Sequence, residues 1–197
     1  MTVHPMRPTT TVALSAVVTG TISDPSGYPL AGITVALFTE GRDQGTRLDT
    51  TITDDVGGYR FTRRQPVAGD DYRVEATDHT GAHVFTRLAV TIDPARPTPQ
   101  DLTMPVAGYV QGTVVSDEQP ATDMCVTASG AHATGAAYVS AKGTFRIGGL
   151  PPGEYAVTFQ DADLTAREPI VVSVAAGRET TIEDQVIDLG QGVRAAR

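Results

Sequence analysis

The sequence predicts an all-β protein made of two β-sandwiches in tandem. Apolar and polar residues alternate in short runs, which is the period of a strand, and no long apolar pattern has the 3.6-residue period of a helix. Twenty glycines and thirteen prolines supply turns between these runs. The strand patterns of the first half also recur, in the same order, in the second half. A length of 197 residues is sufficient for two hydrophobic cores.

The first strands of the chain follow a short arm. Residues 1–10 are rich in proline and threonine, and we expect them to form a flexible N-terminal arm. Alternate positions from Val12 to Ile22 are then mostly apolar, which predicts a strand that ends at the turn Asp24-Pro25-Ser26-Gly27. A second strand is expected to point Ile33, Val35 and Leu37 inward.

The stretch from Ala141 to Phe159 gives the clearest strand pattern in the chain. Phe145 and Ile147 share one face of a first strand, and Tyr155, Val157 and Phe159 share one face of a second. Between them lies Gly-Gly-Leu-Pro-Pro-Gly, in which the prolines cannot donate to a β-ladder and the glycines accept unusual dihedral angles. The stretch therefore predicts a β-hairpin whose apolar face packs against a second sheet.

The second half of the chain repeats the first. Matching segments are 110–114 with 18–22, 120–126 with 29–35, 143–147 with 57–61, 155–157 with 72–74, and 170–174 with 88–92. Loops shorten between the copies while strand patterns persist, as a duplicated sandwich is expected to diverge. We predict repeat 1 over residues 11–105, repeat 2 over residues 106–190, and a C-terminal tail over residues 191–197. Because the linker is short, the two units should lie nearly end to end, with Gly108 permitting some bend.

Composition limits the partners and the cellular setting. The formal net charge is −8 and there is no basic block, so nucleic acid and anionic membrane surfaces are not expected partners. Cys125 is the single cysteine, which rules out an intrachain disulfide, and we expect it to be a small buried residue in a strand. The N-terminal residues lack the continuous apolar run of a signal peptide. These features predict a cytoplasmic or particle-associated protein, with the extracellular surface as the alternative.

Several strings resemble a known family. VTGTISDPSGYPLAGITVALF, TDDVGGYRF and DDYRVEA in the first half, and VQGTVVSD and KGTFRIGGLPPGEYAVTF in the second, resemble carboxypeptidase regulatory-like domains of the transthyretin/prealbumin-like superfamily. That group shades into the B-type repeats of bacterial surface adhesins. The resemblance covers residues 12 to 189 and implies a seven-stranded, transthyretin-like or Ig-like Greek-key sandwich in each repeat. It implies little about function, because such domains are accessory parts of many proteins.

Motifs for catalysis or cofactor binding are missing from the sequence. None of the four histidines has the glutamate three residues later that a zinc carboxypeptidase uses, and no HExxH, GxSxG or phosphate-binding loop occurs. We therefore predict no enzymatic activity and no cofactor. The adhesin-like relatives carry Lys to Asn/Asp isopeptide bonds, but the only lysine, Lys142, lies in a turn rather than in a first strand.

Two metal-site hypotheses remain beside their simpler alternatives. His79 and His83 are four residues apart, but Thr80-Gly81 predicts a turn between them, so incidental histidines on a surface loop are favoured over a metal site. Acidic residues also recur in loops, as in Asp54-Asp55, Asp70-Asp71 and Asp161 with Asp163. They lack the spacing of an EF-hand, and Asp at turns is explained by backbone hydrogen bonding, with calcium as the alternative.

The function predicted from the sequence is a non-catalytic structural or protein-interaction module. It would bind a protein partner or assemble with other subunits, for example in a phage-tail-like or contractile particle. The alternative is a cell-surface adhesion or carbohydrate-binding module. The candidate contact residues are aromatic side chains near loops and the arginines of the only basic cluster, in the less regular loop 62–71: Tyr28, Arg63, Arg64, Tyr109 and Tyr138.

Overall fold

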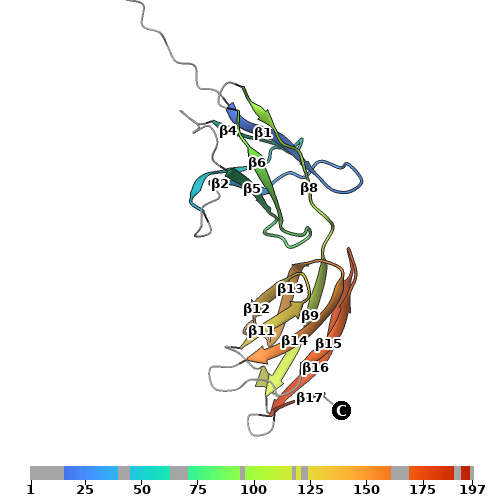
Figure 1. Ribbon diagram of the computed structural model, residues 1–197. Coiled ribbons are helices and arrows are strands. Elements are labelled where there is room, and N and C mark those ends of the chain that lie inside the picture. The colour runs from blue at the N-terminus through green and yellow to red at the C-terminus, as the bar shows by residue number, and fades with distance from the viewer. Residues whose placement is uncertain are drawn as a thin grey trace, which may run out of the picture.

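A computed structural model of the chain confirms the predicted all-β class (Figure 1). It describes residues 16–39, 45–62, 71–93, 96–116, 119–120, 124–160, 169–188 and 192–195. The strands form two units, which follow one another along the chain and are joined by one crossing segment between β8 and β9. Within the described residues, no helix has the length and apolar character needed to cross a membrane.

The first unit is built from β1–β8, in two sheets. Its strands are β1 (Ala16–Ser23), β2 (Thr34–Thr39), β3 (Arg47–Ile52), β4 (Gly58–Thr62), β5 (Asp71–Thr77), β6 (Thr86–Thr91), β7 (Thr98–Pro99) and β8 (Leu102–Thr103). One sheet has the order β4-β1-β7, with β8 also beside β1, and the other has the order β3-β2-β5-β6. Counting β7 and β8 as one interrupted strand gives the seven strands implied by the family resemblance.

The second unit, β9–β17, repeats this arrangement. Its strands are β9 (Gly108–Ser116), β10 (Gln119–Pro120), β11 (Cys125–Gly130), β12 (Thr134–Tyr138), β13 (Thr144–Leu150), β14 (Gly153–Gln160), β15 (Ile170–Val174), β16 (Glu179–Asp188) and β17 (Gly192–Ala195). One sheet contains β10-β9-β16-β17 with β13 on β9, and the other has the order β12-β11-β14-β15. In both units the last main strand lies parallel to the first. The two units therefore share one topology, with β10 and β17 added in the second.

Each unit has its own hydrophobic core, formed by alternate residues of its strands. In the first unit Ile33, Val35 and Leu37 are buried, as the alternation predicts, and they pack with Val18 and Ile22 of β1. The second core contains Phe145 and Ile147 of β13 together with Tyr155, Val157 and Phe159 of β14. Burial of these side chains is the main favourable contribution to the stability of each sandwich.

The predicted hairpin at residues 141–159 is wrong in its pairing. β13 pairs with β9 in one sheet, whereas β14 pairs with β11 and β15 in the other. Residues 151–152 therefore carry the chain from one sheet to the other instead of turning it back within a sheet. The Tyr155 hydroxyl donates a hydrogen bond to the Pro151 carbonyl at 2.9 Å and closes this crossing. Both apolar faces still point into one core, because the two sheets face each other.

Two glycines at equivalent positions of β1 and β9 allow the last strand of each unit to approach. A Cβ on Gly20 would collide with the carbonyl oxygen of Gln100, and one on Gly112 would lie 2.8 Å from that of Ile182. Gln100 follows β7, and Ile182 belongs to β16. The TGT and QGT strings thus mark the position where the first and last strands are closest.

Four further predictions concern Cys125, the N-terminal arm, the C-terminal tail and the boundary between the repeats. Cys125 lies in β11, as expected, but on the partly exposed face opposite the buried Met124 and Val126, so it is not a core residue. The predicted N-terminal arm, residues 1–10, lies outside the described part of the chain. Within the predicted tail 191–197, Gly192–Ala195 form β17, which pairs with β16. The predicted boundary at residues 105 and 106 stays a prediction.

Candidate interaction surfaces

The acidic loop residues stabilise turns. Asp24, Asp54 and Asp78 each begin an Asp-x-x-Gly sequence in which the backbone carbonyl of the aspartate accepts a hydrogen bond from the amide of the glycine at 2.9–3.1 Å. Their carboxylates accept further hydrogen bonds from nearby amides, for example 2.8 Å from Ser26 to Asp24 and 2.7 Å from Gly58 to Asp54. One carboxylate oxygen of each aspartate is thus engaged with the backbone, which is the ordinary role of aspartate at a turn.

The described residues contain no group of three or more His, Cys, Asp or Glu side chains arranged to hold a metal ion. His83 instead places its Nδ1 2.8 Å from the Asp78 carboxylate, while His79 is exposed on the same loop. Asp70 and the pair Asp161 and Asp163, which the calcium hypothesis also used, lie outside the described residues. So do Arg63 and Arg64.

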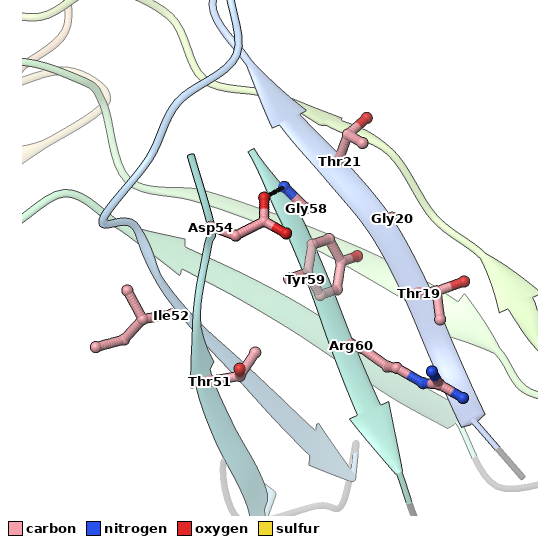
Figure 2. A pocket seen from close by; sticks show the side chains of 9 residues that line it. All are labelled: Thr19, Gly20, Thr21, Thr51, Ile52, Asp54, Gly58, Tyr59 and Arg60. Atoms are coloured by element: carbon pink, nitrogen blue, oxygen red, sulfur yellow. Dashed lines mark hydrogen bonds between the residues drawn. The ribbon is translucent and has the colours of Figure 1, made fainter. Parts of the chain in front are cut away.

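An open groove of about 520 Å³ crosses the first unit from β1 over β4 to the end of β3 (Figure 2). Its lining is formed by Thr19, Gly20, Thr21, Thr51, Ile52, Asp54, Gly58, Tyr59 and Arg60. Three threonine hydroxyls, one guanidinium and one aliphatic side chain therefore border the same groove. Both β3 and β4 are edge strands of their sheets, so the groove lies along two strand edges that are unpaired within the described structure.

The base of the groove is held by hydrogen bonds to the last strand of the first unit. The Tyr59 hydroxyl donates a hydrogen bond to the Gln100 carbonyl at 2.6 Å, and burial raises the pKa of this phenol above its ordinary value. On the β1 side, both the amide and the hydroxyl of Thr21 donate to Asp101, at 2.7 and 2.9 Å. These contacts fix β1 and β4 against the last strand of the unit.

Ile52 and Arg60 are two side chains of the groove that remain available to a partner. Ile52 is 63% exposed at the end of β3, although its side chain is apolar. Arg60 is exposed between the buried Tyr59 and Phe61, as the alternation predicts, and makes no ion pair within the part of the chain that the structure describes. Because Arg60 is paired with Thr19 in the sheet, their side chains share one face.

The second unit differs at the corresponding place. Tyr138 lies opposite Cys125 of β11, and Ile52 lies opposite Thr34 of β2. Because Cys125 and Thr34 occupy the same position in the two units, Tyr138 is the equivalent of Ile52. Tyr138 is 80% exposed. Gly135 in β12 would place a Cβ only 2.6 Å from Ile147 of β13, so these two edge strands are in close contact.

The predicted contact residues lie apart from one another. Tyr28 is 68% exposed in the loop between β1 and β2, and Tyr138 ends β12 in the other unit. Tyr109 lies in β9, where the Arg146 guanidinium covers one face of its ring at 3.7 Å, so it is not a free aromatic surface. No hydrogen bond or ring contact joins any two of the three. Whether they bind a partner stays a prediction.

Sequence reasoning missed Ile52 as a contact candidate. Ile52 shares its parity with Leu48, which packs partly against the first core, so the alternation alone assigns both residues to the interior. A β-bulge skips Leu48, since Asp49 lies opposite Leu37 and Arg47 opposite Phe38. The parity of β3 therefore changes at the bulge, and Ile52 lies on the outer face, opposite Thr34. The adjoining turn Asp54-Asp55-Val56-Gly57 marks the end of the strand but gives no signal for the bulge.

Comparisons with known proteins agree with the architecture. Residues 17–105 match the family model of the Carboxypeptidase regulatory-like domain, so the first unit is a domain of this kind. A comparison with curated proteins gives no match.

Three of the matching solved structures are bacterial proteins. The Streptococcal ancillary pilin is 15% identical with a TM-score of 0.46, over 89% of this chain and 63% of the pilin. The TIE protein of Bacillus anthracis is 16% identical with a TM-score of 0.38, over 87% of this chain and 33% of that protein. GBS52, the minor pilin of Streptococcus agalactiae, is 13% identical with a TM-score of 0.41, over 93% and 98%. This chain therefore spans less than two thirds of the first two proteins.

Proposed function

We propose that this chain is a non-catalytic structural or adhesion module, and that its first unit binds a partner protein through the edge formed by β3 and β4. The observation that carries the proposal is the groove along these edges, where Ile52 is exposed and Arg60 is exposed without an ion pair in the described part of the chain. An extended segment of a partner can add to such an edge, with main-chain hydrogen bonds giving affinity and side-chain pockets giving specificity.

The groove favours a segment with a particular chemistry. Arg60 would pair with a carboxylate of the segment, which is a favourable contact because the guanidinium has no ionic partner of its own in the described structure. Ile52 would cover an aliphatic or aromatic side chain, and the hydroxyls of Thr19 and Thr51 can donate to or accept from its backbone. The proposed partner segment is therefore extended, with an acidic and an apolar residue.

A protein partner is favoured over a carbohydrate. Sugar-binding sites commonly stack the sugar ring on aromatic side chains, but Tyr28 and Tyr138 belong to different units and Tyr109 is partly covered by Arg146. The described structure thus assembles no platform from the three tyrosines. The groove, by contrast, brings several binding groups to one place.

We place this module at the extracellular surface rather than in a phage-tail-like or contractile particle. The family match of the first unit agrees with the resemblance found in the sequence, which extends to the repeats of bacterial surface adhesins. None of the comparisons described above supports a particle component. Fractionation of host cells, with detection of the chain in the surface fraction and loss of signal after protease treatment of intact cells, tests this setting. Detection only in the cytoplasm would contradict it.

The edge itself is tested by cross-linking in host cells, comparing the natural chain with the double variant Ile52→Asp and Arg60→Glu. We expect the cross-linked partner to be lost, because the variant places two acidic groups beside the acidic segment. Val171→Asp is the matched control, since Val171 is an exposed aliphatic residue, 67% accessible, on an edge strand of the second unit. Equal cross-linking of the double variant and the natural chain would overturn the proposed edge.

A further inference from the structure

The segment between the two units is hydrogen-bonded along its length. His83, in the loop before β6, forms an antiparallel bridge with Val106 of the linker. On either side of this bridge, the Val84 amide donates to Pro105 and the Ala107 amide donates to Ala82, both at 2.8 Å. The linker is thus paired with a loop of the first unit, which restricts the bending that a free segment of this length would allow.

This loop, Asp78–Val84, is closed by its own side chains. One carboxylate oxygen of Asp78 accepts hydrogen bonds from the amide and hydroxyl of Thr80, at 2.8 and 2.6 Å. The other lies 2.8 Å from Nδ1 of His83, which donates because an ionised carboxylate can only accept. The side chains of Asp78 and His83 are only 7% and 17% exposed. The loop is therefore fixed in shape at the point where it meets the linker.

The loop also contacts the second unit directly. The Gly149 amide of β13 donates a hydrogen bond to the Gly81 carbonyl at 2.8 Å. A Cβ on Gly81 would lie 3.0 Å from the Cα of Gly148, and the φ of Gly81 is +75°. Glycines on both sides let the two backbones touch, so this contact depends on the absence of side chains.

We propose that the loop Asp78–Val84, closed by Asp78 and His83, is a clasp that holds the two units in one fixed orientation. The clasp engages the linker on one side and the Gly148–Gly149 backbone on the other. The protein then presents the exposed ends of β3 and β12 as parts of one rigid body. The clasp does not depend on the proposed binding groove, whose residues it does not use.

NMR relaxation of the uniformly labelled full chain tests the clasp. We expect both units of the natural protein to tumble with one common correlation time and the Gly149 amide to exchange slowly with solvent. In His83→Ala, which leaves the Asp78–Thr80 turn in place, the correlation time of each unit should fall toward that of a body of half the mass. Gly81→Ala, which crowds Gly148 and also strains the loop at a positive φ, should have the same effect.

His79→Ala is the matched control, because His79 is an exposed histidine of the same loop with no hydrogen bond in the described structure. It should keep the common correlation time. The clasp is overturned if the natural protein already tumbles as two independent bodies, if its Gly149 amide exchanges freely, or if Gly81→Ala and His83→Ala tumble as His79→Ala does. Well-dispersed signals from both units establish that each variant is folded, and free exchange of the Gly149 amide in the natural chain would overturn the clasp without any variant.

Discussion

Thr53 and Val139 occupy the same position in the two units, but only Thr53 makes side-chain hydrogen bonds. The Thr53 amide donates a hydrogen bond to the Ile33 carbonyl, and the Val139 amide donates one to the Met124 carbonyl, both at 2.9 Å. Ile33 and Met124 each precede the second strand of their unit. The Thr53 hydroxyl additionally donates to the Leu30 carbonyl at 2.7 Å and accepts from the Ile33 amide at 2.9 Å. Thr53 is a polar side chain that is buried in the first unit.

Replacement Thr53→Val should therefore destabilise the first unit, although valine has the same shape and is natural at the equivalent position 139. The Ile33 amide would be left buried without its partner, which costs about 1–3 kcal/mol. Urea unfolding followed by NMR signals of each unit measures the change. Thr50→Val, at an exposed position of β3, is the control and should leave the midpoint in place. An unchanged midpoint for Thr53→Val would show that the hydroxyl is dispensable.

Gly20→Ala tests the close approach of the first and last strands. Because the new methyl group would collide with the Gln100 carbonyl, the last strand must move, and we expect a loss of about 1–3 kcal/mol in the first unit. Thr19→Ala, one residue earlier in β1, removes atoms instead of adding them and should have a smaller effect. The free energy of unfolding from urea titration is the measurement. Equal effects of the two substitutions would contradict the steric explanation.

The parts of the fold that follow from local patterns could be predicted from the sequence. The alternation identified the inward faces of β2, β13 and β14, because strand geometry fixes the direction of neighbouring side chains. It could not identify strand partners. Gly-Gly-Leu-Pro-Pro-Gly is compatible with a turn inside a sheet and with a crossing between sheets, and the choice depends on β9 and β11, which are distant in sequence.

The candidate surface was less predictable for the same reason. Tyr28 and Tyr138 are exposed, as residues near turns often are, but Tyr109 is covered by Arg146 from another strand. The exposure of Ile52 depends on the β-bulge at Leu48, which is defined by the pairing of β3 with β2. Such contacts join residues far apart in the chain, so no local pattern encodes them.

Tyr155→Phe should destabilise the second unit by about 1 kcal/mol, because it removes the hydrogen bond from the phenol to the Pro151 carbonyl while keeping the buried ring. Burial also raises the pKa of this phenol, so the neutral form is favoured in the folded state. The contribution of the neutral Tyr155 phenol to the free energy of unfolding is therefore complete below the ordinary pKa of tyrosine. It is lost as the pH rises through the higher pKa that this phenol has in the folded state. Tyr138→Phe, at a residue that is 80% exposed, is the control and should leave the stability of the second unit unchanged.

Acid should weaken the first unit through Asp78. Burial of the Asp78 carboxyl raises its pKa, but hydrogen bonds from Thr80 and His83 outweigh burial and hold the pKa below the ordinary 3.8. A depressed pKa means that the ionised form stabilises the folded state; this contribution is complete above pH 3.8 and is lost as pH falls through the lower folded-state value. Hydrogen bonds from the Ser26 hydroxyl and the Tyr28 amide also hold the pKa of Asp24 below its ordinary value, which adds to the same trend.

The urea midpoint of the first unit, measured between pH 7 and pH 2, should therefore fall at the acid end. Asp78→Asn has no carboxylate to protonate, so its midpoint should be lower at pH 7 and should fall less on acidification. Asp54→Asn is the chemical control, since Asp54 stabilises a turn of the same Asp-x-x-Gly type without a histidine partner. If Asp78→Asn kept the full acid dependence of the natural chain, the titrating group would have to be another carboxylate.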